Sequence, residues 1–98
     1  MKIRELFTDE SKWTTHAYAR TKEGKVLLNA HLPEAVCWCL DGAISKCYLF
    51  GNESDQLRTY YMIKHKIFEH VNENPVPWND HPKRTFAEVK QLVETLDI

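Results

Sequence analysis

Cysteine and histidine are the side chains in this sequence whose chemistry suits a metal site or a nucleophile. On a helix, Cys37 and Cys39 would point about 200° apart, so their thiols would not hold one metal ion together. His65 and His70 are five residues apart, which misses the i, i+4 spacing at which two imidazoles share a metal. We therefore predict no metal site, no cofactor and no catalytic residue, and we expect the cysteines to be small apolar core residues.

The segment between Trp78 and Thr85 is the most distinctive part of the chain, because a Trp-Asn-Asp run is bounded by prolines. Asparagine and aspartate side chains readily bond nearby backbone N–H groups, and loops often carry binding residues. One interpretation is that Trp78 fills the core while its polar neighbours tie the loop to the last helix. The other is a presented surface whose candidate binding residues are Trp78, Asn79, Asp80 and Arg84.

Composition places the chain among ordinary globular proteins. Its 98 residues suit one domain, residues 1–98, and 43% of them are hydrophobic. Thirteen Lys and Arg nearly balance 14 Asp and Glu, so the net charge of −1 excludes a generic polycation for nucleic acid or anionic membranes.

No apolar run has the length that spans a bilayer, and the first residues lack the apolar core of a secretory signal. Three cysteines without a paired framework favour a reducing cytoplasm.

Local patterns predict a mainly α fold, α+β in detail, with one short N-terminal β-hairpin. Ile3, Leu6 and Phe7 have helical spacing, and residues 18–26 form a hairpin closed at Gly24. A helix is expected over roughly residues 55–73, with a core stripe of Leu57, Tyr60, Tyr61, Lys64, Phe68 and Val71 and with Ile67 at its edge. The prolines of residues 75–82 argue against helix there. The last helix begins at Thr85 with a capping box.

The central element is predicted to be a buried helix over residues 33–50. Pro33 suits the first turn of a helix, and apolar residues surround most of the circumference that follows. Gly42 would lie in the middle of this helix, where glycine costs about 1 kcal/mol relative to alanine. We expect the compensation to be the close approach of another backbone.

Three stretches of the chain occur in a recognisable order. They are Trp13 with Ala19-Arg20 and Gly24, then Cys39-Leu40-Asp41-Gly42-Ala43, then Trp78-Asn79-Asp80 with Arg84-Thr85 and Glu88-Val89. This order resembles an uncharacterised family of small bacterial and phage proteins, a domain of unknown function with Cys-x-x-Gly-Ala and Trp-Asn-Asp…Arg-Thr motifs. Thr21 departs from the aspartate expected after the Ala-Arg pair. The resemblance implies a fold and a mobile-element setting, and it supplies no activity.

For function we expect a non-catalytic module that binds another protein. In a mobile-element setting it would be a modulator or inhibitor of a host protein complex. The alternative is a nucleic-acid-binding regulator whose Lys66, Lys83 and Arg84 contact phosphates, on a helical face that also holds Arg58 and Lys64. A third and weaker alternative is a metal-dependent or cysteine enzyme that uses Cys39, His81 or Asp80.

Overall fold

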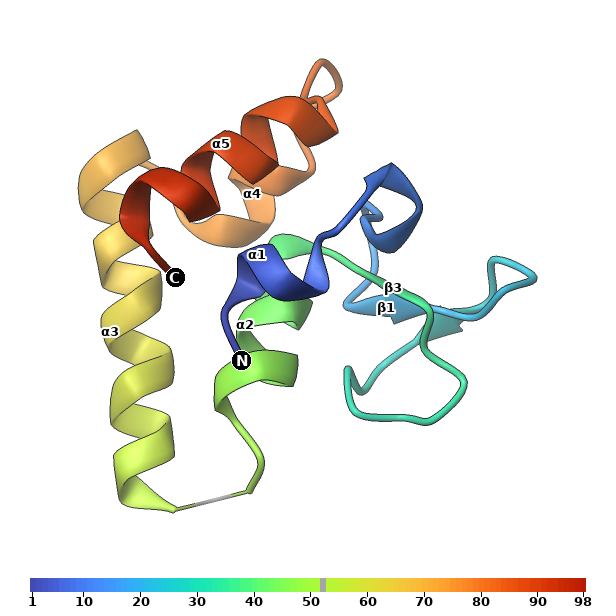
Figure 1. Cartoon of the computed structure of the whole chain (residues 1–98), viewed down its shortest axis with the longest axis horizontal. Helices are drawn as coiled ribbons and strands as arrows, with labels where there is room; N and C mark the ends of the chain where they lie inside the picture. Colours follow the sequence, from blue (N-terminus) through green and yellow to red (C-terminus); the bar gives the residue numbers. More distant parts are fainter. Residues whose placement is uncertain (52) are drawn as a thin grey trace.

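Helix α2, Leu40–Tyr48, lies at the centre of the computed structural model, which describes residues 1–51 and 53–98 (Figure 1). Helices α1, α3 and α4 all contact it. Its sequence has few polar residues, and six residues of the helix are accordingly buried. They are Leu40, Asp41, Gly42, Ala43, Ile44 and Cys47. The prediction of an apolar central helix is thus confirmed in substance, although its boundaries are not.

The predicted start of this helix at residue 33 is wrong. Pro33 lies in a turn, residues 37–38 form strand β3, and the helix begins at Leu40. Pairing with strand β1, Ala19–Arg20, holds this segment extended, because Cys39 donates its backbone N–H to the Tyr18 carbonyl at 3.3 Å. A partner about twenty residues away in sequence therefore overrides the local helix signal.

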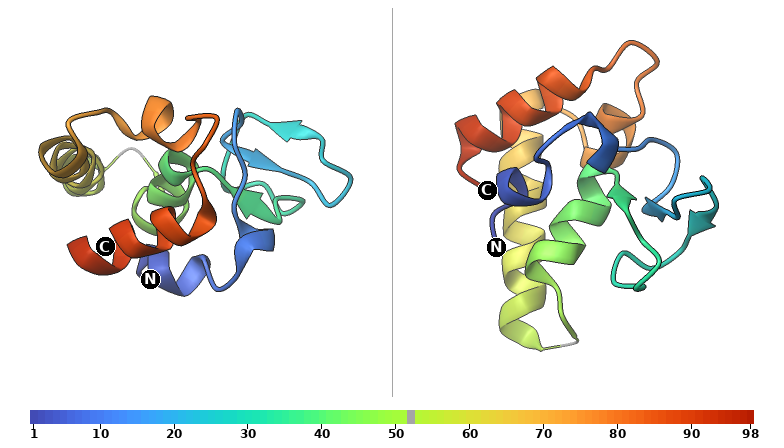
Figure 2. Two further views of the ribbon diagram at one scale, coloured as in Figure 1. Left: turned by 90° about the horizontal axis from the view of Figure 1, so that it is seen from above. Right: turned by 45° about the vertical axis from the view of Figure 1, so that its right-hand side comes forward.

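The sheet has three short antiparallel strands in the order β2-β1-β3, with β2 at Val26–Leu27 and β3 at Cys37–Trp38. Strands β1 and β2 form the predicted hairpin, and Gly24 in its turn has a φ of +86°. The two views of Figure 2 place the strands to one side of the helices. The architecture is therefore mixed α+β with helices predominating.

Helix α3, Ser54–Val71, closely matches the predicted range of 55–73 and ends at Asn72, whose φ of +58° is left-handed. The predicted core stripe is partly wrong. Ile63 and Ile67 are the buried side chains, whereas Tyr61 and Phe68 are 62% and 42% exposed. Aromatic residues occur on both sides of this helix, so hydrophobicity alone did not fix which side faces α2.

Helix α4, Pro75–Asn79, corrects the prediction that this proline-rich segment is not helical. Both prolines lie in its first turn, where the backbone N–H groups have no partner within a helix, so the rings displace no hydrogen bond. Helix α5, Phe86–Leu96, begins as predicted, with Thr85 and Glu88 forming a capping box. The predicted N-terminal helix is α1, Ile3–Leu6, and it is followed by the 3-10 turn η1, Glu10–Lys12.

Candidate functional site

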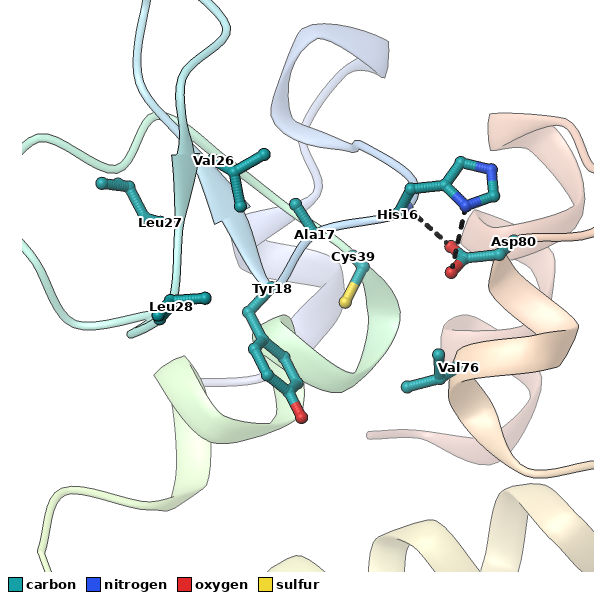
Figure 3. A pocket seen from close by; sticks show the side chains of 9 residues that line it. All are labelled: His16, Ala17, Tyr18, Val26, Leu27, Leu28, Cys39, Val76 and Asp80. Carbon is teal, nitrogen blue, oxygen red and sulfur yellow. Dashed lines mark hydrogen bonds and ion pairs between the residues drawn. The ribbon is translucent and has the colours of Figure 1, made fainter.

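A hollow of about 390 Å³ lies between the hairpin and helix α4 (Figure 3). The strands supply most of one side, α4 and the residue after it supply the other, and the segment leading into α2 contributes a thiol. The lining residues are His16, Ala17, Tyr18, Val26, Leu27, Leu28, Cys39, Val76 and Asp80. Its size is at the small end of the range for ligand pockets.

The apolar side of the hollow follows from strand alternation. Ala19 pairs with Leu27, and both are buried on the core face of the sheet. Residues one position away point to the opposite face, so Tyr18, Val26 and Leu28 are 46%, 45% and 85% exposed. Val76 is 40% exposed and points from α4 toward the hairpin (Figure 3). The hairpin thus has a hydrophobic face that the rest of the described chain covers only in part.

His16 and Asp80 form the polar end of the hollow. The backbone N–H of His16 donates to Asp80 Oδ1 at 2.9 Å, and His16 Nδ1 lies 3.7 Å from Asp80 Oδ2 (Figure 3). The φ of His16 is +60°, a left-handed conformation that is uncommon for residues other than glycine. Asn79 Nδ2 also donates to Asp80 Oδ1, at 3.0 Å. Hydrogen bonds to its neighbours therefore hold the Asp80 carboxylate in place.

Cys39 lines this hollow, and its side chain serves as the N-cap of α2. Its Sγ accepts a hydrogen bond from the backbone N–H of Gly42 at 3.3 Å, and only 3% of the residue is exposed. Burial raises the pKa of the Cys39 thiol to about 11. At neutral pH the sulfur is protonated, which is the opposite of what an activated nucleophile requires.

The four residues predicted as a binding surface lie close together, but they face different environments. Trp78 and Asn79 are buried. Arg84 stacks over the Trp78 ring at 3.9 Å and donates from Nε to the Trp78 carbonyl at 2.9 Å, while its Nη1 pairs with Glu88. Asp80 alone among the four lines the hollow. The contacts of Trp78 and Asn79 are those expected if Trp78 fills the core and its polar neighbours tie the loop in place. A binding role for the four residues stays a prediction.

Sequence reasoning missed the apolar part of this site. The signal was the run Val26-Leu27-Leu28, because three consecutive apolar residues in a strand place at least one side chain on each face. Val76 carried no signal, since its segment was not expected to be helical.

The cations proposed for a nucleic-acid surface are largely engaged within the chain. Lys64 Nζ lies 3.8 Å from the buried Asp41 carboxylate and 5.0 Å from the centre of the Tyr60 ring. Lys66 Nζ donates to the Leu96 carbonyl at 2.8 Å. Together with the stacked Arg84, three of the five cations contact the protein itself.

Two further observations concern the binding of metal ions and the crossing of a membrane. Within residues 1–51 and 53–98, no three His, Cys, Asp or Glu side chains are grouped so that they could hold a metal ion. No helix in the same described residues has both the length and the apolar character needed to cross a bilayer.

Comparison with known proteins gives one match. The sequence model of a family of unknown function (DUF6197) matches residues 2–96, nearly the whole chain. No curated protein and no solved structure matches the chain.

Proposed function

Because the chain belongs to DUF6197, a family of unknown function, we propose its role from the geometry of its surface: it is a non-catalytic module that binds another protein. The supporting observation is the group of exposed apolar side chains, Tyr18, Val26, Leu28 and Val76, around the hollow. Exposed apolar groups that adjoin a recess and have polar residues at one end are typical of binding sites.

The chemistry of the hollow supports binding over catalysis. Its thiol is protonated at neutral pH and serves as a helix cap, so Cys39 does not offer a thiolate. His16 and Asp80 form the remaining polar pair, and their shortest contact is a structural bond from a backbone amide. This arrangement fixes a loop and presents a carboxylate.

Nucleic-acid binding is the alternative function, and the intramolecular contacts of Lys64, Lys66 and Arg84 reduce the charge available for phosphates. The proposal includes a setting in bacteria and their phages, which the family resemblance implies, and a cytoplasmic location, which the three cysteines without a paired framework favour. In that setting the partner would be a host protein complex whose activity this module modulates or inhibits.

The test is a comparison of proteins captured by three purified baits. Leu28→Asp places a charge at the most exposed apolar position of the hollow, and Met62→Asp makes the same change on α3, where Met62 is 63% exposed. Both substitutions are at the surface, where effects on stability are usually within about 0.5 kcal/mol. We expect a protein that the wild-type chain and Met62→Asp both capture and that Leu28→Asp does not.

The captured protein is then purified and its affinity for the three chains is measured directly. A partner that binds all three equally would contradict the proposal, as would a set of captured proteins that does not depend on the bait. A gel-shift titration of the wild-type chain at two salt concentrations tests the alternative, because phosphate contacts make binding salt-dependent.

A further inference from the structure

We propose that the hollow accepts a lysine or arginine side chain of the partner, with its aliphatic stem on the apolar walls and its charged head at Asp80. This inference rests on the proposed function and specifies the chemistry of its partner. It combines two features of the same recess, an apolar wall and a fixed carboxylate at one end.

One oxygen of the Asp80 carboxylate has both of its acceptor positions occupied by hydrogen bonds, and the other oxygen does not. Oδ1 accepts the His16 backbone N–H at 2.9 Å and Asn79 Nδ2 at 3.0 Å. Oδ2 lies 3.7 Å from His16 Nδ1, which is beyond hydrogen-bond distance. The side chain is only 20% exposed, so it is held in one orientation before any ligand arrives.

The charge of the hollow favours a cation. Asp80 is the single carboxylate among the nine lining residues, and none of them is a lysine or arginine. Arg84, four residues away in sequence, is directed to Trp78 and Glu88 instead. The imidazole of His16 is 70% exposed, so it can move aside for a cation that binds Oδ2.

The walls favour a cation that has an aliphatic stem. Val26 and Leu28 line the hairpin side of the hollow and Val76 lines the α4 side, and the ring of Tyr18 lies between Leu28 and Val76 in the view of Figure 3. Lysine and arginine lay their methylene groups on apolar surface while the charged head reaches a polar partner. A recess of about 390 Å³ accommodates one such side chain together with a small apolar neighbour.

The experiment selects binders from a displayed library of random 12-residue peptides, with the wild-type chain as bait. We expect enrichment of peptides in which lysine or arginine adjoins an aliphatic residue. Enrichment should persist with Glu23→Gln, which removes an exposed carboxylate at the tip of the same hairpin, and be lost with Asp80→Asn. Asparagine at position 80 keeps an oxygen that can accept the His16 amide, so we expect the fold to be retained.

The decisive measurement is a double-mutant cycle on one selected peptide. Norleucine in place of the peptide's lysine keeps the stem and removes the charge. We expect Asp80→Asn and lysine→norleucine each to weaken binding about tenfold, and the two together to weaken it no more than either alone. If Asp80→Asn fails to fold, the norleucine peptide on the wild-type chain still tests the contact.

This inference would be overturned by peptides whose binding depends on Leu28 but which contain no basic residue. It would also be overturned by peptides that bind the Asp80→Asn variant with unchanged affinity. Either result would leave the proposed function intact. No enriched peptide at all would also overturn it. The proposed function fails separately, when no captured protein distinguishes Leu28→Asp from Met62→Asp.

Discussion

Asn79 is a single side chain that joins three segments distant in sequence. Its Oδ1 accepts hydrogen bonds from Trp13 Nε1 at 2.7 Å and from the backbone N–H of Leu40 at 3.0 Å. Its Nδ2 donates to the Thr14 carbonyl at 3.1 Å and to Asp80. The residue is fully buried, and all four of its hydrogen-bonding positions are occupied. This asparagine therefore ties α4 both to the start of α2 and to the segment that leads into the hairpin.

Asn79→Leu should lower the free energy of unfolding by about 3 kcal/mol, because it leaves the Trp13 and Leu40 donors without an acceptor. The matched control is Asn74→Leu, at an exposed N-cap whose side chain makes no cap hydrogen bond. Urea unfolding monitored by circular dichroism measures both variants. Equal losses for the two substitutions would contradict the role given to Asn79.

The elements that the sequence predicted well are those whose signals are local. The capping box of α5 and the turn glycine of the hairpin act within a few residues, and both are confirmed. The start of α2 depends on pairing with β1, and the helical state of residues 75–79 depends on prolines that occupy only the first turn. The hollow joins residues about sixty positions apart, so local patterns show neither its shape nor its position.

Contact between the hairpin and α2 depends on Gly42, as the sequence led us to expect. A Cβ placed at Gly42 would lie 2.0 Å from the Tyr18 carbonyl oxygen, far inside van der Waals contact. The carbonyl of Tyr18 is itself held by the N–H of Cys39. The hairpin therefore packs against α2 at backbone-to-backbone distance.

Gly42→Ala should destabilise the chain by about 2 kcal/mol, although alanine is the better helix former, because the added methyl group forces the two backbones apart. Gly51→Ala is the control, since a Cβ there meets nothing within 4 Å. Thermal unfolding midpoints distinguish the two. A midpoint for Gly42→Ala at or above that of the wild type would contradict the close packing.

At the scale of the whole molecule, ionisable groups in the core make stability depend on alkaline pH. Burial raises the pKa of Cys39 and of Cys47 to about 11, from 9.0. Burial and the hydrogen bond to the Asp41 carboxylate also raise the pKa of Tyr60. Each group is held neutral in the folded state, so its contribution is complete below its unfolded pKa and is lost as the pH rises through the folded value.

We expect the free energy of unfolding to fall between pH 9 and pH 11, by roughly 2 kcal/mol for each thiol. The double variant Cys39→Ser, Cys47→Ala removes both thiols, and serine retains an acceptor for the α2 cap. Urea titrations under reducing conditions at pH 8 and pH 11 should show a smaller alkaline loss for this variant. An equal loss would place the origin of the alkaline sensitivity elsewhere.

The left-handed backbone at His16 connects the hairpin to the polar end of the recess. A residue with a side chain pays a conformational penalty at a φ of +60°, and here the Asp80 carboxylate receives the amide that this twist exposes. This hydrogen bond joins the segment that leads into the hairpin to the residue that follows α4. The polar end of the recess and the loop that enters the hairpin therefore depend on the same carboxylate, so a substitution that removed this acceptor would disturb both.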